Sequence, residues 1–399
     1  MYVFLGLFDV WFSLEKRYNY IIQGAGASGL WLAYWLQKEG LLTDKSLLIV
    51  ECDAIKRNDR TWCFWGEELL DEMPFVDFSW NHVQVFGESQ RIDPYTYHHC
   101  RSEAFYEFVK NALESTGHVD WCFGRVEKAV QNEGRVEVEI DTKREGESRI
   151  HAIGADWFFG SGGASVKTSE IALWQSFVGW RVKSRSGESI FDSDACTLMD
   201  FGIEQMGKTR FLYVLPFNGK EALVEVTQFD KEKLQLEDGE RMLREICAAR
   251  GWEVSVTELE YNAIPMSSVF DCLERFHKRG VRIVPLGVAA GALKPTTGYG
   301  FVRMMQHGKS IAVALKKSES IPTLYRKMRF RFYDDLLLRI LYQHPEKGKQ
   351  IFDQLFQHKR ATTVLRFLNE KTNFFQEVMI FLWLPKRLFL STLFAKWKS

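Results

Sequence analysis

A glycine-rich turn near the N-terminus restricts the fold of this chain more than any other segment. Residues 18–22 are apolar and predict a short strand, and residues 30–38 predict a helix. Between them lies Gly24-Ala25-Gly26-Ala27-Ser28-Gly29, and a second apolar strand over residues 46–50 ends in Glu51. A GxGxxG turn between strand and helix, with an acid about 20 residues further on, is typical of a dinucleotide-binding fold.

The residue types in this unit have separate physical tasks. The first glycine allows the tight turn, the second lets the backbone approach a pyrophosphate, and the third lets the helix pack on the strand. The phosphate then lies at a helix N-terminus, where N–H groups are free, and the acid accepts hydrogen bonds from a ribose. We therefore predict cofactor contacts at Gly24, Ala25, Gly26, Ala27, Ser28, Gly29 and Glu51.

A second glycine-rich turn occurs late in the chain. Residues 281–286 predict an apolar strand, Gly287 and Gly291 follow it, and residues 300–315 predict a helix. The order of strand, glycine-rich turn and helix suits a second contact with the cofactor. We therefore add Gly287 and Gly291 to the predicted cofactor-binding residues.

Residues 211–229 predict a β-hairpin that carries a carboxylate. Two apolar runs flank Asn218-Gly219, a pair that favours a type I′ turn because both central residues need a positive φ. A two-residue loop would place Leu212 opposite Glu225, on a largely apolar face. Burial there would raise the pKa of the carboxyl, which could then donate a proton near neutral pH. The alternative interpretation is an edge strand with Glu225 in water.

Composition narrows the class of protein. The chain has 399 residues and zero net charge, so no electrostatic argument points to nucleic acid. Its seven cysteines form no CxxC pair, which predicts a reduced, cytoplasmic chain without a bound metal. Residues 374–399 mix aromatic, apolar and basic side chains. That mixture suits a helix lying in a membrane interface, although a terminal helix that caps the core would look the same.

Several motifs in a specific order resemble the bacterial, FAD-binding type of lycopene β-cyclase. The resemblance extends from about residue 18 to the C-terminal helices and does not cover residues 1–17. Many members of that family have a second acid directly after the residue matching Glu225, whereas this chain has Val226. The motifs are GAGASG at 24–29, NDRTWCFW at 58–65, WQSFVGW at 174–180, FLYVLPF and LVEVT within 211–227, and IPM at 264–266 followed by KPTTGYGF at 294–301.

The resemblance implies a function and a mechanism. Family members bind FAD, which is active in its reduced form with NAD(P)H as the reductant. They convert the ψ end-groups of lycopene and of other carotenoids with acyclic ends to β-rings, giving γ-carotene and then β-carotene, without net redox change. Glu225 matches the essential proton donor of the family. Trp62, Trp65 and Trp180 are aromatic candidates for stabilising a cation, although packing in the core is the commoner role of such residues.

The expected fold class is α/β, with a Rossmann-like FAD-binding domain interleaved with a β-sheet substrate domain and followed by a helical C-terminal region. We expect an N-terminal extension at 1–17, an FAD-binding domain from 18–65, 150–165 and 280–320, a substrate domain from 66–149 and 166–279, and helices over 321–399 that contact a membrane lipid surface. The protein would then be cytoplasmic and peripheral to the membrane. Two other functions stay open: a flavin-dependent redox enzyme acting on a carotenoid or isoprenoid, and an inactive carotenoid-binding protein.

Overall fold

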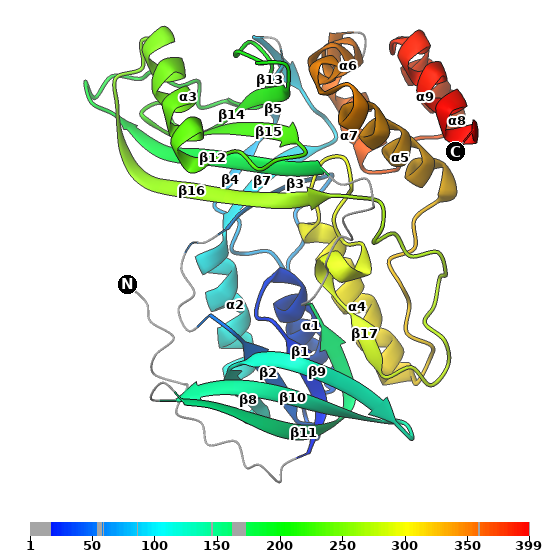
Figure 1. Ribbon diagram of the computed structural model, residues 1–399. Helices are drawn as coiled ribbons and strands as arrows, with labels where there is room; N and C mark the ends of the chain where they lie inside the picture. The colour runs from blue at the N-terminus through cyan, green and yellow to red at the C-terminus, as the bar shows by residue number, and fades with distance from the viewer. Residues whose placement is uncertain are drawn as a thin grey trace.

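The computed structural model describes residues 17–53, 58, 60–85, 87–144, 147–161, 173–357 and 360–398. A lower sheet with three helices lies below an upper sheet, and a helical region at the C-terminal end lies beside the upper sheet (Figure 1). The predicted N-terminal extension, apart from its last residue, lies outside the described residues, and so do residues 162–165 of the predicted FAD-binding domain.

The lower sheet contains the first glycine-rich turn. It has the order β8-β2-β1-β11-β10-β9, and β17 pairs with β11. Strands β1 and β2 are parallel, as the predicted strand–turn–helix–strand unit requires. The strands are β1 (Tyr18–Gln23), β2 (Leu47–Glu51), β8 (Val119–Phe123), β9 (Arg125–Asn132), β10 (Arg135–Arg144), β11 (Glu147–Gly160) and β17 (Ile283–Pro285).

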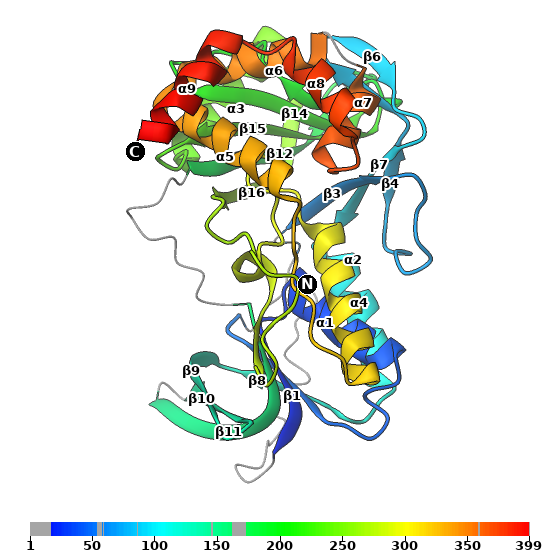
Figure 2. The same cartoon turned by 90° about the vertical axis from the view of Figure 1, so that its right-hand side faces the viewer.

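Three helices pack together above this sheet, as Figure 2 shows from the side. They are α1 (Ala27–Lys38), α2 (Ser102–Glu114) and α4 (Phe301–Lys317). Trp31 of α1 is fully buried between them and contacts the rings of Phe105 and Phe301. The short 3₁₀ helix η2 (Gly287–Ala290), in the turn after β17, contacts α1.

The predicted domain boundaries need correction at two places. Residues 102–144 were assigned to the substrate domain, but α2 packs in the core beside α1, and β8 continues the lower sheet through parallel pairing with β2. Residues 61–66 were assigned to the FAD-binding domain, but they form β3, which pairs with β7 in a separate small sheet. Strand pairing between distant segments, which local periodicity does not encode, decides both boundaries.

The upper sheet has the order β16-β12-β15-β14-β13-β5-β6. Helix α3 (Leu236–Ala249) covers one of its faces, while the small sheet of β3, β7 and β4 lies toward the other. The strands are β5 (His82–Val85), β6 (Glu88–Arg91), β12 (Leu173–Ser184), β13 (Ala195–Asp200), β14 (Thr209–Asn218), β15 (Glu221–Asp230) and β16 (Val254–Met266), with β3 (Thr61–Gly66), β4 (Phe78–Trp80) and β7 (Thr96–Arg101) in the small sheet.

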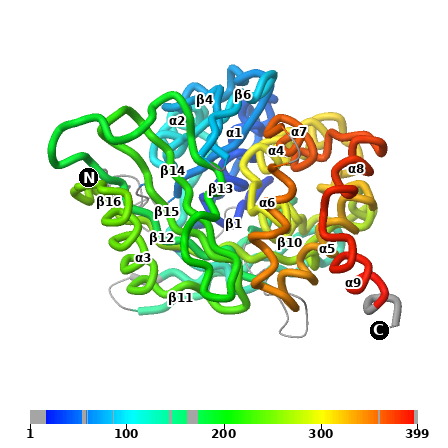
Figure 3. Tube along the Cα trace, turned by 90° about the horizontal axis from the view of Figure 1, so that it is seen from above, coloured from blue at the N-terminus to red at the C-terminus, as the bar shows by residue number. Residues whose placement is uncertain are grey.

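The C-terminal region is helical, as predicted. Figure 3, seen from above, shows α8 and α9 at the periphery, with α5 and α6 between them and the upper sheet. Within the described residues, no helix is both long enough and apolar enough to cross a membrane. The helices are α5 (Met328–Gln343), α6 (Gly348–Gln357), α7 (Ala361–Leu368), α8 (Phe374–Phe381) and α9 (Lys386–Lys398), with the 3₁₀ helix η3 (Pro345–Lys347) before α6.

The predicted hairpin exists as β14 and β15, but its register differs by one residue. Tyr213, not Leu212, lies opposite Glu225. The turn pairs Asn218 with Glu221, one residue later on each strand than predicted, and the irregularity between Pro216 and Asn218 takes back part of that shift. The turn is also different: neither Asn218 nor Gly219 has a positive φ. The Asn218 Oδ1 atom accepts hydrogen bonds from the backbone N–H groups of Lys220 and Glu221, which closes the turn one residue later than predicted.

Candidate active site

The glycine-rich turn after β1 leaves room for a ligand at one of its three glycines. Gly24 has a φ of +92°, and a Cβ on Gly29 would lie 2.0 Å from the Gly24 carbonyl oxygen, so both positions need glycine for the backbone packing itself. A Cβ on Gly26 would have no atom within 4 Å. Gly26 begins α1, where free N–H groups and the helix dipole favour a phosphate. The turn therefore has the open backbone surface that a pyrophosphate requires.

Polar groups around this turn are arranged as a dinucleotide site needs. Glu51 is buried at the end of β2, and its Oε2 atom accepts a hydrogen bond of 2.6 Å from the Ala25 N–H. The Ser28 hydroxyl is buried without a hydrogen-bond partner in the described residues, and it lies 3.1 Å from where a Cβ on Gly287 would be. The structure thus brings Gly287 next to the first turn, and its contact with a cofactor stays a prediction.

The glycine at position 291 is explained by local backbone packing. Its φ is +74°, and a Cβ there would lie 2.5 Å from the backbone oxygen of Phe270. The need for glycine at this position follows from backbone packing, and its contact with a cofactor stays a prediction.

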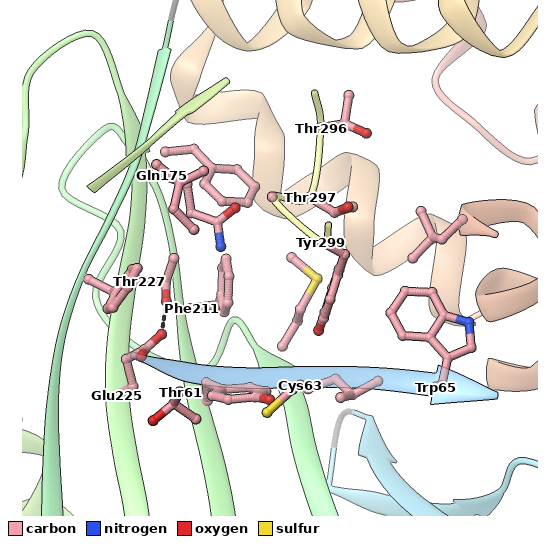
Figure 4. A pocket seen from close by; sticks show the side chains of 18 of the residues that line it. Thr61, Cys63, Trp65, Gln175, Phe211, Glu225, Thr227, Thr296, Thr297 and Tyr299 are labelled. Atoms are coloured by element: carbon pink, nitrogen blue, oxygen red, sulfur yellow. Dashed lines mark hydrogen bonds between the residues drawn. The ribbon is translucent and has the colours of Figure 1, made fainter. Parts of the chain in front are cut away.

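A large apolar cavity lies between the upper sheet, the small sheet and the C-terminal helices. It encloses about 1190 Å³, part of which is open to solvent. Figure 4 shows Glu225 at its left, the loop of Thr296, Thr297 and Tyr299 above, and Trp65 at its right. The lining of this cavity is mostly apolar, which suits a hydrocarbon ligand.

Glu225 projects into this cavity from the interior of the sheet. Strand β15 lies between β12 and β14, so the alternative of an edge strand in water does not apply. The side chain is 9% exposed, and its Oε1 atom accepts a hydrogen bond of 2.7 Å from the Thr227 hydroxyl (Figure 4). Burial raises the pKa of the carboxyl to about 8, even though the Thr227 hydroxyl favours the ionised form. Glu225 is therefore protonated at neutral pH.

A cluster of tyrosines lies near Glu225, and one of them, Tyr213, pairs with it on the neighbouring strand β14. The Tyr97 hydroxyl is within 2.6 Å of the Tyr213 hydroxyl and 2.7 Å of the Tyr299 hydroxyl. Burial raises the pKa of all three phenols, so they stay neutral. Tyr213 and Tyr299 line the cavity with neutral aromatic surface, and this cluster was not predicted from the sequence.

The three tryptophans named as cation-stabilising candidates have different positions. Trp62 and Trp65 line the cavity, and Trp65 packs edge-on against Tyr299 at 4.6 Å between ring centroids. Trp180 instead packs on the opposite face of β12, in the cluster beneath α3. It cannot contact a molecule in the cavity.

A second apolar cavity of about 550 Å³ extends the first one among the C-terminal helices. The two cavities share the lining residues Thr296, Thr297, Phe352, Leu355 and Leu368. Its other walls come from helices α5, α6, α7, α8 and α9 and the turns between them. The combined space is elongated and leads from Glu225 toward the outer helices.

Two buried polar atoms where the cavity meets the loop at 294–301 have no hydrogen-bond partner among the described residues. Within the described residues, Gln175 Oε1 and Thr297 Oγ1 are buried without a hydrogen bond. Both residues line the cavity, and the N-terminal end of α4 reaches it through Gly300 and Phe301. A polar ring system placed there would supply the missing hydrogen bonds, which fits the flavin of a bound FAD.

Comparison with solved structures identifies the fold of this chain. It is similar to a geranylgeranyl bacteriochlorophyll reductase-like protein from Thermoplasma acidophilum, with a TM-score of 0.58, 12% identity and coverage of 94% of this chain and 98% of that chain. A flavoprotein/dehydrogenase from Cytophaga hutchinsonii has a TM-score of 0.58 at 15% identity, with 96% and 100% covered. A p-nitrophenol 4-monooxygenase from Pseudomonas putida DLL-E4 has a TM-score of 0.57 at 15% identity, with 94% and 98% covered. The chain therefore has the fold of these proteins.

The family follows from the sequence as a whole. The model of the family described as lycopene cyclase protein matches residues 19–393, nearly the whole chain. This protein belongs to the lycopene cyclase family, which confirms the resemblance read from its motifs. A search of curated proteins finds no match.

Proposed function

We propose that this protein is a lycopene β-cyclase, which converts the ψ end-groups of lycopene to β-rings by protonation and ring closure. The observation that carries the proposal is a buried, protonated Glu225 in an elongated apolar cavity of a lycopene cyclase family member. A carboxylic acid in such a place can protonate an alkene, and nothing in the reaction requires a net change of oxidation state.

The Glu225 carboxyl transfers its proton to C2 of the end-group, which leaves a cation at C1. The C5=C6 double bond then attacks C1, forms the C1–C6 bond and moves the cation to C5. Loss of the C6 proton completes the β-ring. The apolar walls exclude water that would otherwise add to the cation, and the faces of Tyr213, Tyr299 and Trp65 are placed to stabilise it.

FAD would be held by the turn at 24–29, by Glu51 and Gly287, and by the loop at 294–301. Reduced FAD supplies negative charge that stabilises a nearby cation. The chain contributes the N-terminal end of α4 beside the cavity, where the helix dipole favours a negative group.

An anaerobic assay of the purified protein tests the function. Lycopene in liposomes, with FAD reduced by a small excess of NAD(P)H or dithionite, should yield γ-carotene and β-carotene with the mass of lycopene. Because the reaction is an isomerisation, reductant consumption should stay far below one equivalent per ring over many turnovers. A product that differs in mass, or reductant oxidised in step with product, would instead identify a redox enzyme. Unchanged lycopene recovered with the protein would identify a binding protein.

We propose that the outer face of α8 and the start of α9 rest on a lipid surface, from which the water-insoluble substrate is drawn. Phe374 and Phe375 are 63% and 79% exposed, and Met379, Trp383 and Phe394 are also largely exposed. The basic residues Lys386 and Arg387 adjoin this apolar face. Exposed aromatic groups beside cations are typical of helices that lie in a membrane interface.

The double variant Phe375→Glu, Met379→Glu is expected to lose flotation with anionic liposomes. Burying a side chain of this size in lipid contributes about 1.5–3 kcal/mol, so affinity should fall at least tenfold for each substitution. Removal of residues 374–399 is a poorer test, because buried Glu377 of α8 is bonded to Arg329 and Tyr333 of α5. Ile150→Glu, at an exposed position on the distant lower sheet, is the control and should float as before. Unchanged flotation of the double variant would place the attachment elsewhere.

A further inference from the structure

A second carboxylate, Glu260, lies level with Glu225 in the upper sheet. Gly179 of β12 pairs with Glu225 of β15 on one side and with Glu260 of β16 on the other. The two glutamates therefore flank one glycine, and both line the cavity. A Cβ on Gly179 would lie 3.5 Å from the Cβ and Cγ atoms of Glu225, so the side chain of Glu225 leans over the glycine.

Each carboxylate is held by a hydroxyl from a different neighbour. Thr227 of β15 donates to Glu225, and Thr61 of β3 donates to Glu260. Glu225 is buried, whereas Glu260 lies on the outermost strand and is half-buried, with Leu259 and Tyr261 exposed beside it. The two carboxylates thus differ in their access to solvent.

The proposed cyclisation requires a base close to the acid. C2, which receives a proton, and C6, which loses one, are both bonded to C1 in the closed ring. The group that takes the C6 proton must therefore lie near the Glu225 carboxyl, on the wall of the same cavity.

Few groups on that wall can act as the base. Among the described lining residues, the carboxylates are Glu225, which becomes a base once it has donated its proton, and Glu260, and no histidine lines the cavity. Burial raises the pKa of the Cys63 thiol to about 12, and it raises the pKa of Tyr213 and Tyr299 as well, so these groups hold their protons and offer no basic atom.

On the basis of the proposed cyclase function, we propose that Glu260 is the catalytic base that accepts the C6 proton across Gly179 from the proton donor Glu225. The O–H bond of Glu225 breaks as the C2–H bond forms, and the C5=C6 electron pair forms the C1–C6 bond. The electron pair of the C6–H bond then forms the new C5=C6 double bond, and the proton moves to Glu260. The two glutamates together hold one proton before and after the reaction. Glu260 afterwards releases its proton toward solvent, and Glu225 is reloaded for the next ring.

Glu260→Gln tests this role by separating protonation from deprotonation. The variant should bind FAD and melt as wild type does, and it should form β-rings at least 100-fold more slowly, within the range of about 100- to 10,000-fold for a general base. In D₂O, Glu225 still delivers a deuteron to C2, and when C2 turns before the reverse step, the Glu225 carboxylate removes the original hydrogen and leaves the deuterium in place. Lycopene recovered from the Glu260→Gln enzyme should therefore gain one mass unit per end-group, whereas lycopene recovered from Glu225→Gln should gain none.

The outcomes separate the two proposals. Cyclisation by Glu260→Gln at the wild-type rate would overturn the base role and leave Glu225 as the donor. Loss of both cyclisation and deuterium uptake would also overturn it, because Glu260 would then act before protonation. Cyclisation by a folded Glu225→Gln enzyme would instead remove the donor and the cyclase mechanism with it. Glu258→Gln is the matched control, since Glu258 lies two residues away on β16, is bonded to Arg101 and does not line the cavity.

Thr61→Val provides a second test if Glu260→Gln fails to fold. Burial raises the pKa of Glu260, and the hydrogen bond from the Thr61 hydroxyl partly offsets that rise. The other charged or titratable groups nearby are Glu225, Glu258, Arg101 and His99. Without the hydroxyl, the pKa of Glu260 rises, so the base ionises only at higher pH. The acidic limb of the pH–rate profile should therefore shift to higher pH. An unshifted acidic limb in a folded Thr61→Val enzyme would contradict the base role.

Discussion

Glu225→Gln is expected to abolish the formation of β-rings while leaving the fold intact. Glutamine has nearly the same volume and still accepts the hydrogen bond from Thr227, but it cannot release a proton at useful cost. General acids contribute about 100- to 10,000-fold to rate, and protonation of an unactivated alkene belongs at the upper end. FAD content and melting temperature should match wild type, and pigment chromatography from lycopene-accumulating bacteria should show lycopene alone.

Two comparisons make this result specific to the acid. Glu221→Gln, at the partly exposed start of the same strand, removes an ion pair with Lys183 and should retain activity. In the wild type, the pKa of about 8 for Glu225 means that the donor is protonated below pH 8 and loses its proton as the pH rises through that value. Activity should therefore decline above about pH 8. Robust cyclisation by a well-folded Glu225→Gln enzyme would leave Glu225 as an ordinary strand residue.

Gly26→Val is expected to remove flavin binding without unfolding the protein. Gly26 has a φ of −85°, which any residue adopts, and a Cβ there would have no atom within 4 Å. The valine side chain would instead occupy the space over the N-terminus of α1 in which the pyrophosphate is expected to lie. The purified variant should be colourless, with a circular dichroism spectrum like that of the wild type, and inactive in the cyclisation assay.

Gly29→Val serves as the contrasting variant. A Cβ at Gly29 would lie 2.0 Å from the backbone oxygen of Gly24 and 3.0 Å from Ile22, so the turn itself would have to move. We expect this protein to be poorly soluble or to melt at a much lower temperature. A folded Gly26→Val protein that retains a full complement of yellow FAD would show that the cofactor does not approach this turn.

The alternation of side chains along β15 explains why the residue after Glu225 cannot take part in proton transfer in the cavity. Val226 is fully buried on the opposite face of β15, in the cluster beneath α3. Successive side chains of a strand point to opposite faces, so an acid at this position would not enter the cavity. The second carboxylate comes from another strand, 35 residues further along the chain than Glu225.

The sequence by itself determined the local features of this protein. The spacing of Gly24, Gly26 and Gly29 after an apolar strand predicted the first turn correctly, because Gly24 and Gly29 meet short-range requirements of the backbone and Gly26 leaves open space beside it. The alternation of apolar residues predicted β14 and β15 and a largely apolar face for Glu225, while an edge strand with Glu225 in water stayed open. The helical periodicity of the C-terminal region was confirmed in the same way.

Tertiary structure decided which strands pair with β14 and β15 and in which register. The later turn, together with the irregularity between Pro216 and Asn218, placed Tyr213 instead of Leu212 opposite Glu225. The pairing of β12 with both β15 and β16 brought Glu260 to the same level. The alternation of side chains in residues 254–266 is compatible with a strand, but it carries no information on which strand becomes its partner. Pairing and register between distant segments depend on how all side chains of the sheet pack at once, and so the acid could be predicted from the sequence while its proposed base could not.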